Sequence, residues 1–162
     1  MTATPHQLST VLFLCSGNYY RSRFAEHIFN TYILDTGLSW TADSRGLIVD
    51  RVVNNIGPIS HYAVNGLLER GISVPEPWRF PIQLLESDLA AAKLVIALKE
   101  TEHRPLLTER FPQWPDRVEY WQIHDLDYAL PADALTALTQ EVTQLIQRLH
   151  AQAPSPAPPR LS

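Results

Sequence analysis

The sequence predicts an α/β fold in which helices cover both faces of a parallel sheet. Short apolar runs alternate with segments whose apolar residues recur every three or four positions, which is the pattern of strands followed by helices. The 162 residues suffice for one domain with a buried core. Hydrophobic residues make up 45% of the chain and charged residues 19%, which is typical of a globular domain.

The first strand is expected at about residues 10–15, where β-branched, aromatic and leucine residues lead to Cys15. The first helix is expected at about 21–35, because its apolar residues recur with the period of one helix face. They are Phe24, Ala25, Ile28, Phe29 and Tyr32. A second strand is expected at about 39–44.

The second helix is expected to begin near Pro58 and Ser60 and to end at Gly71. Its predicted apolar face consists of Ala63, Val64, Leu67 and Leu68. Residues 72–82 contain three prolines and predict irregular chain.

The second half of the chain repeats the alternation. A short helix is expected to open at residues 87–88, followed by a third strand at 94–98, a helix at 100–110 and a fourth strand at 118–123. A final helix is indicated by apolar residues spaced at close to 3.5 positions. They are Leu135, Leu138, Val142, Leu145 and Leu149.

We expect residues 1–152 to form the single domain and residues 153–162 to form a disordered, proline-rich tail. Four of the ten tail residues are proline, a composition typical of chain that does not pack. The alternative is a proline-rich ligand for another domain.

Composition and charge exclude several classes of protein. The net charge of −4 and the pI near 5.8 argue against a nucleic-acid partner. No apolar run approaches the length of a membrane span, so no membrane partner is expected. One cysteine excludes an internal disulfide and indicates a reducing compartment, so we predict a cytoplasmic protein. The six histidines show no zinc-site spacing, so no metal site is expected. The reaction predicted below needs no other cofactor.

The segment from Cys15 to Ser22 predicts an anion site with a nucleophile. It lies between a strand and a helix, where N–H groups and the positive end of the helix dipole stabilise an anion. Gly17 gives the backbone freedom to turn, and Arg21 offers a planar fork that matches two phosphate oxygens. The same field favours the Cys15 thiolate, which is the reactive form. The alternative is a buried, inert cysteine.

A family resemblance is carried by Cys15-Ser16-Gly17-Asn18-Tyr19-Tyr20-Arg21-Ser22 and the following Arg23-Phe24-Ala25-Glu26. The segment resembles the signature of low-molecular-weight protein tyrosine phosphatases, Cys-x-Gly-Asn-x-Cys-Arg-Ser-Pro-x-Ala-Glu. The resemblance implies a flavodoxin-like three-layer αβα sandwich with a four-stranded parallel sheet in the order 2-1-3-4. It implies Cys15 as nucleophile and Arg21 as phosphate clamp. The implied phosphate-binding residues are Ser16, Gly17, Asn18, Tyr19, Tyr20, Arg21 and Ser22.

The same resemblance gives roles to single residues. Asn18 is implied to hold the loop's shape, Ser22 to donate a hydrogen bond to the thiolate, and Ser44 to match the serine of the family's Ser-Ala-Gly segment. The family's general acid is an aspartate in an Asp-Pro step. Asp125 matches it, although Leu126 replaces the proline.

Asp127 is a second candidate for the acid, because any nearby carboxylic acid suits proton donation to a poor leaving group. The alternative is that both aspartates are solvated loop residues. Two departures from the family put substrate and efficiency in question. Tyr20 replaces the family's second loop cysteine, and Lys99 stands near the position where many members carry an aspartate.

The sequence therefore predicts a metal-independent phosphatase that forms a phosphocysteine. Its expected substrate is a phosphotyrosine protein or a small phosphate ester, and its product is inorganic phosphate. Two other functions stay open. One is a non-catalytic module that binds phosphoproteins. The other is an arsenate reductase that uses a small-molecule thiol, which needs only Cys15.

Overall fold

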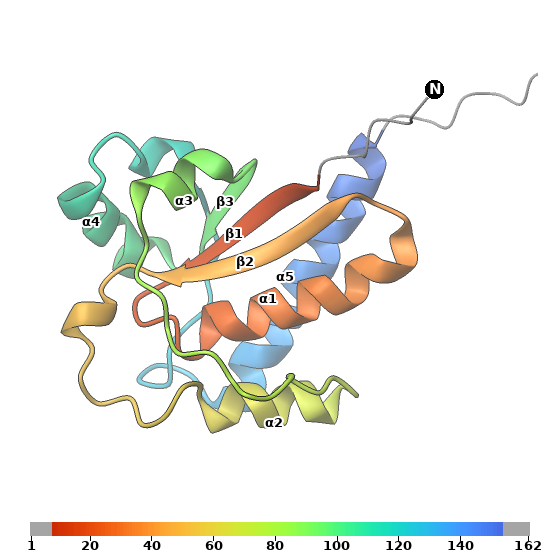
Figure 1. Cartoon of the computed structure of the whole chain (residues 1–162), viewed down its shortest axis with the longest axis horizontal. Helices are drawn as coiled ribbons and strands as arrows, with labels where there is room; N and C mark the ends of the chain where they lie inside the picture. Colours follow the sequence, from red (N-terminus) through yellow and green to blue (C-terminus); the bar gives the residue numbers. More distant parts are fainter. Residues whose placement is uncertain (1–7, 154–162) are drawn as a thin grey trace, which may run out of the picture.

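The computed structural model describes residues 8–153 and contains a central parallel sheet with helices on both sides (Figure 1). The strands lie in the order β2-β1-β3-β4. Their bounds are β1 Ser9–Cys15, β2 Trp40–Gly46, β3 Leu94–Ala97 and β4 Glu119–Tyr120. The α/β fold and the strand order are thus confirmed.

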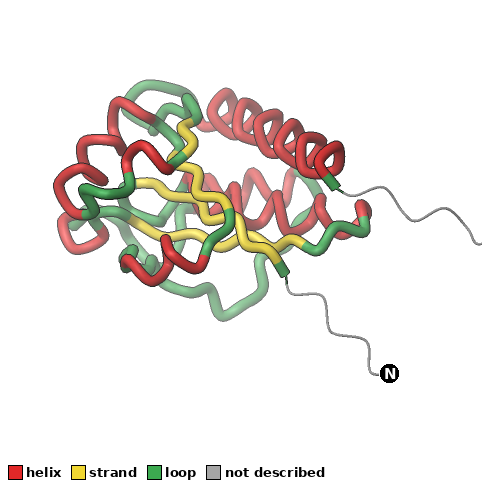
Figure 2. Tube along the Cα trace, turned by 90° about the horizontal axis from the view of Figure 1, so that it is seen from above, coloured by secondary structure: helices red, strands yellow, loops and turns green. Residues whose placement is uncertain are grey.

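The helices form two layers around the sheet (Figure 2). The first layer contains α1 (Arg21–Tyr32), α2 (His61–Glu69) and α5 (Pro131–Gln152), and the second contains α3 (Glu86–Ala91) and α4 (Glu100–Arg110). Side chains alternate along β1: Val11 and Phe13 join the core beneath α1 and α5, whereas Leu12 and Leu14 join the core beneath α3 and α4. Both faces of β1 are therefore buried, as the continuous apolar run predicts.

The ends of the first two helices differ in detail from expectation. Helix α1 ends at Tyr32 and continues as a 3₁₀ turn, Ile33–Thr36, until Gly37 adopts a left-handed conformation with φ 72°. Helix α2 begins after Ser60, whose side chain accepts a hydrogen bond from the Tyr62 N–H as the expected cap. Leu68 was expected on the apolar face but is 53% exposed, because the packed stripe of this short helix is narrow.

The fourth strand is shorter than the expected 118–123. After β4 the chain still bonds to its neighbour, since the Trp121 N–H donates to Ala97 O at 2.9 Å and the Ile123 N–H donates to Leu98 O at 2.7 Å. Regular pairing stops because the chain turns toward the loop after β1, where the Ile123 carbonyl accepts a hydrogen bond from Arg21.

The proline-rich tail predicted at 153–162 lies outside the described residues from residue 154 onward. Among the helices of residues 8–153, none is long and apolar enough to cross a membrane.

Candidate active site

Residues 16–20 connect β1 to α1 and form a tight loop at the carboxyl edge of the sheet (Figure 1). Two of its carbonyls are held from outside. Ser16 O accepts from the Ile48 N–H and Tyr19 O accepts from the Ser60 N–H, both at 2.9 Å. The loop is thereby fixed against the chain after β2 on one side and against the start of α2 on the other.

Cys15 ends β1 and is 3% exposed. Its Sγ lies 2.9 Å from Oγ of Ser22, in the first turn of α1. Ser22 Oγ also accepts from Nδ2 of Asn18 at 2.8 Å, so the serine proton is free to point at the sulfur. A hydroxyl donor and a helix N-terminus therefore both lie at the sulfur.

Asn18 occupies the left-handed region at φ 51° and is fully buried. Its side chain uses every direction open to it. Nδ2 donates to the hydroxyls of Ser22 and Ser44 at 2.8 and 2.9 Å, and Oδ1 accepts from Arg79 and from the Ile82 N–H, both at 3.0 Å. Asparagine tolerates this backbone conformation better than most residues, and the four bonds fix it there.

Arg21 is 2% exposed and faces a carboxylate from α4. Its two terminal nitrogens donate to the two oxygens of Glu102 at 2.9 and 2.8 Å, and one of them also donates to Ile123 O at 3.1 Å. Ser16 Oγ donates to the same Glu102 carboxylate at 2.7 Å. The Nε–H of Arg21 makes no hydrogen bond with any residue of 8–153, so that edge of the guanidinium is available for an anion.

The environment of Glu102 keeps it ionised. Burial by itself raises the pKa of Glu102, but the hydrogen bond and charge of Arg21, helped by His103 and Ser16, outweigh burial and lower the pKa to about 2. His103 is fully buried, and burial followed by the charge of Arg21 lowers its pKa to about 3. Its Nδ1 accepts from the Lys99 N–H at 3.0 Å, so the neutral ring carries its proton on Nε2.

The two candidate acids lie differently. Asp125 Oδ2 is 3.6 Å from a terminal nitrogen of Arg21, and Oδ1 accepts from the Leu126 N–H at 2.9 Å. Asp127 is exposed, and its side chain makes no ion pair or hydrogen bond within the described chain. The structure therefore brings Asp125, and not Asp127, to the loop.

The two loop tyrosines point in different directions. The Tyr19 hydroxyl donates to Ile56 O at 2.6 Å. Tyr20 packs edge-on against Tyr62 with ring centroids 6.4 Å apart, and its buried hydroxyl has no partner among residues 8–153. Burial, and next the charge of Asp125, raise the pKa of Tyr20 to about 12, so the hydroxyl keeps its proton.

Glu102 and Arg79 were not found by sequence reasoning. Arg79 joins three parts of the site, since it donates to Asn18 Oδ1, to Ser44 Oγ at 3.0 Å and to Glu26 at 2.9 Å. Arg79 comes from the proline-rich segment, which carries no periodic signal. The available signal for Glu102 was its place in the first turn of a helix that follows a central strand, since such a turn lies at the same edge of the sheet as Cys15.

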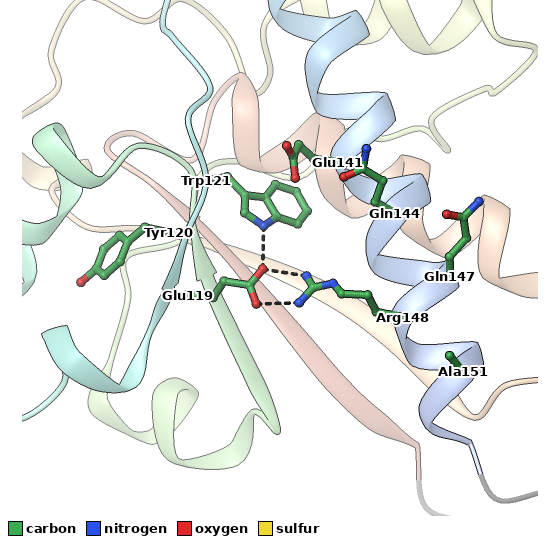
Figure 3. A pocket seen from close by; sticks show the side chains of 8 residues that line it. All are labelled: Glu119, Tyr120, Trp121, Glu141, Gln144, Gln147, Arg148 and Ala151. Atoms are coloured by element: carbon green, nitrogen blue, oxygen red, sulfur yellow. Dashed lines mark hydrogen bonds and ion pairs between the residues drawn. The ribbon is translucent and has the colours of Figure 1, made fainter.

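Outside this site, a pocket of about 620 Å³ lies between β4 and α5 (Figure 3). Three of its polar groups bond to one another, because Glu119 accepts from Trp121 Nε1 at 2.7 Å and pairs with Arg148 at 2.8 Å. It contains no candidate residue from the sequence. Within residues 8–153, no group of three or more His, Cys, Asp or Glu side chains is arranged to hold a metal ion.

This arrangement indicates a class of protein. A buried thiol, a helix N-terminus and a buried arginine together are typical of the active site of a cysteine-based phosphatase. The family described as low molecular weight phosphotyrosine protein phosphatase matches residues 10–154. The chain therefore belongs to that family, as the resemblance of its loop predicts. No curated protein sequence matches the chain.

The chain is also similar to solved structures of phosphatases. A low molecular weight protein tyrosine phosphatase from T. tengcongensis is 29% identical, with 90% of this chain and 99% of that chain covered and a TM-score of 0.68. The YwlE arginine phosphatase from Geobacillus stearothermophilus is 24% identical, with 89% and 92% covered and a TM-score of 0.64. Vibrio vulnificus Wzb, in complex with benzylphosphonate, is 19% identical, with 90% and 99% covered and a TM-score of 0.66. The last two show the shared fold alone.

Proposed function

We propose that this protein hydrolyses phosphate monoesters through a phosphocysteine, with protein phosphotyrosine as its substrate class. One observation carries the proposal. Cys15 Sγ lies 2.9 Å from Ser22 Oγ at the N-terminus of α1, the helix whose first residue is the buried Arg21. A nucleophile therefore meets a proton donor and a planar cation at a place where a dianion is stabilised.

In the first step the Cys15 thiolate attacks phosphorus. The S–P bond forms, the P–O bond to the leaving group breaks, and Asp125 gives its proton to the departing oxygen. The free Nε edge of Arg21 and the loop N–H groups bind the equatorial oxygens, whose charge they stabilise most in the transition state. The Ser22 hydroxyl donates a hydrogen bond to the thiolate before attack, and it donates to the sulfur again when the S–P bond breaks in the second step.

In the second step water releases the enzyme. The Asp125 carboxylate takes a proton from water, the water oxygen attacks phosphorus, and the S–P bond breaks to give inorganic phosphate and the thiolate. The cycle needs no metal and no cofactor. It does need a reduced Cys15, which a cytoplasmic location would provide.

Phosphotyrosine is supported by the family description and by the surroundings of the acid. Tyr128 is 76% exposed and lies on the same loop as Asp125, where its ring is free to stack on an aryl leaving group. A related structure is described as an arginine phosphatase, so phosphoarginine is the substrate to compare.

The test is hydrolysis of para-nitrophenyl phosphate by the wild type and by Cys15→Ser, without metal, with a reductant, from pH 5 to 7.5. We expect metal-independent turnover that falls more than about a thousandfold in the variant, while the variant still binds phosphate. Substantial turnover by Cys15→Ser would refute the nucleophile.

Three further measurements separate the alternatives. A folded wild type that binds phosphopeptides without turnover would be a binding module, and thiol-dependent formation of arsenite would indicate arsenate reduction. Faster hydrolysis of a phosphoarginine peptide than of the matched phosphotyrosine peptide would overturn the substrate class.

A further inference from the structure

Lys99 stands at the same edge of the sheet as Cys15. It is the second residue after β3 and the cap position before α4. Its N–H donates to His103 Nδ1 at 3.0 Å, and its backbone forms an antiparallel bridge with Gln122. Both contacts fix the base of this side chain beside the candidate active site.

The ammonium of Lys99 lacks an anionic partner. The residue is only 8% exposed, and its Nζ lies 4.0 Å from the ring centroid of Tyr128. Within residues 8–153 the side chain makes no hydrogen bond and no ion pair. Withdrawing a cation from water without a carboxylate is unfavourable, and stacking on one ring offsets only part of this cost. The three N–H donors of the ammonium remain open to a ligand.

The ring that Lys99 contacts belongs to the loop of the proposed general acid. Tyr128 and His124, whose rings are 6.1 Å apart, lie on either side of Asp125 in sequence. Asp125 reaches back to Arg21 at 3.6 Å. Because Asp125 protonates the leaving oxygen in the proposed reaction, Lys99 and Tyr128 flank the path of the leaving group.

One cation and one unpartnered polar nitrogen face this place. Lys99 supplies a positive charge, and the buried Nδ1 of His124 has no partner among the described residues. Asp127 is exposed on the same loop and makes no ion pair with Lys99.

We propose that Lys99, stacked on Tyr128, forms a subsite for a carboxylate next to the phosphorylated residue, so that the preferred substrate is an acidic phosphotyrosine peptide. This inference rests on the proposed function. Lys99 binds the carboxylate of a flanking Glu or Asp while Arg21 holds the phosphate, so two anionic groups are recognised together.

The experiment compares two phosphotyrosine peptides that differ only in having Glu or Gln on both sides of the phosphotyrosine. For the wild type at low salt we expect kcat/KM to be about fivefold higher for the Glu peptide, a preference that weakens with added salt. In Lys99→Met the ratio falls to about one, and in Lys99→Arg it recovers because the charge is restored. Lys93→Met is the matched control. Lys93 is the chain's only other lysine and stacks on Trp40 at 5.5 Å, before rather than after β3.

The outcomes separate this inference from the proposed function. A ratio that is the same in the wild type and Lys99→Met overturns the subsite and leaves Lys99 as a packing residue, with the phosphatase intact. If neither peptide is hydrolysed, the proposed function fails, and calorimetric binding of both peptides to Cys15→Ser decides the subsite. Tighter binding of the Glu peptide that depends on Lys99 supports it, and equal or absent binding overturns it.

Discussion

Asp125 and Asp127 show how much a single contact distinguishes two like residues. They are two positions apart in one loop, but only Asp125 approaches Arg21, at 3.6 Å. In the proposed reaction the general acid must reach an oxygen of the phosphate that Arg21 binds, so the position of the carboxyl group matters more than the residue type. Glu102 has a different role. It pairs with the two terminal nitrogens of Arg21 at 2.9 and 2.8 Å and thereby fixes the orientation of the guanidinium.

Replacing Asp125 by Ala should slow hydrolysis most for substrates whose leaving oxygen needs a proton to depart. We expect a loss of about 10²–10⁴-fold for phenyl phosphate and a much smaller loss for aryl phosphates whose leaving groups are acidic. The dependence of kcat on leaving-group pKa measures this. Asp127→Ala is the control and should keep the wild-type dependence. An equal loss by Asp125→Ala on every leaving group would contradict the acid role.

Tyr20 predicts how the enzyme responds to oxidation. Cys15 is the chain's only cysteine, so its sulfenic acid has no second thiol in the loop with which to form a disulfide. We expect prolonged excess peroxide to inactivate the wild type in a way that dithiothreitol does not reverse. Tyr20→Cys restores the family's second loop cysteine and should make inactivation reversible. Full recovery of the wild type with thiol would refute this expectation.

At the scale of elements, β2 supports the loop by close approach. A Cβ added to Gly46, the last residue of β2, would overlap Val49 Cγ2 and come within 3.0 Å of the backbone of Gly17 and Asn18. The loop and the strand end therefore fit only because position 46 has no side chain. Gly66 is equally crowded, but against Leu135 and Phe24, at the junction of α2 with α5 and α1.

These two glycines give a matched pair of alanine variants. Gly46→Ala should displace the loop backbone and lower kcat/KM by about a hundredfold. Its free energy of unfolding should change less than that of Gly66→Ala. Gly66→Ala should cost about 1–3 kcal/mol of stability through overpacking and leave kcat/KM near the wild-type value. Kinetics and chemical denaturation on both variants check this, and a Gly46→Ala variant with wild-type kinetics would contradict it.

At the scale of the whole molecule, the sheet lies between two hydrophobic cores, and the candidate site lies at its carboxyl edge. Two neighbouring residues of α4 have side-chain pKa values that differ between the folded and the unfolded chain. Glu102 has its pKa lowered to about 2, and the buried His103 has its pKa lowered to about 3. For each group, the unfolded state binds more protons than the folded state when the pH lies between the group's folded and unfolded pKa values. The free energy of unfolding therefore rises with pH over that range.

The free energy of unfolding should therefore fall as the medium is acidified. His103 contributes as pH decreases from about 6.5 toward 3, and Glu102 contributes from about 4.5 toward 2, each by at most about 1.4 kcal/mol per pH unit. Urea denaturation from pH 7 to pH 3 measures the slope. Glu102→Gln should flatten it below pH 4.5, whereas Glu69→Gln, which removes an exposed carboxylate of α2, should not. A stability that is constant from pH 6.5 to pH 4 would contradict the assignment of His103, and an unchanged slope below pH 4.5 in Glu102→Gln would contradict that of Glu102.

The sequence by itself determined the family, the order of strands and helices, and the eight-residue loop from Cys15 to Ser22. These features are local: an apolar run, a helical period and a short signature each lie within a few turns of chain, so their geometry follows from neighbouring residues. Even there the ends shifted, as in β4, because tertiary hydrogen bonds decide where pairing stops.

Only the tertiary structure decided which distant side chains complete the site. Glu102 reaches Arg21 across 81 positions, and Arg79 reaches Asn18 across 61. Lys99 meets Tyr128 only because β3 and the loop before α5 end at the same edge of the sheet. Contacts of this range depend on how strands are ordered and how helices pack, and no local pattern of residues records that information.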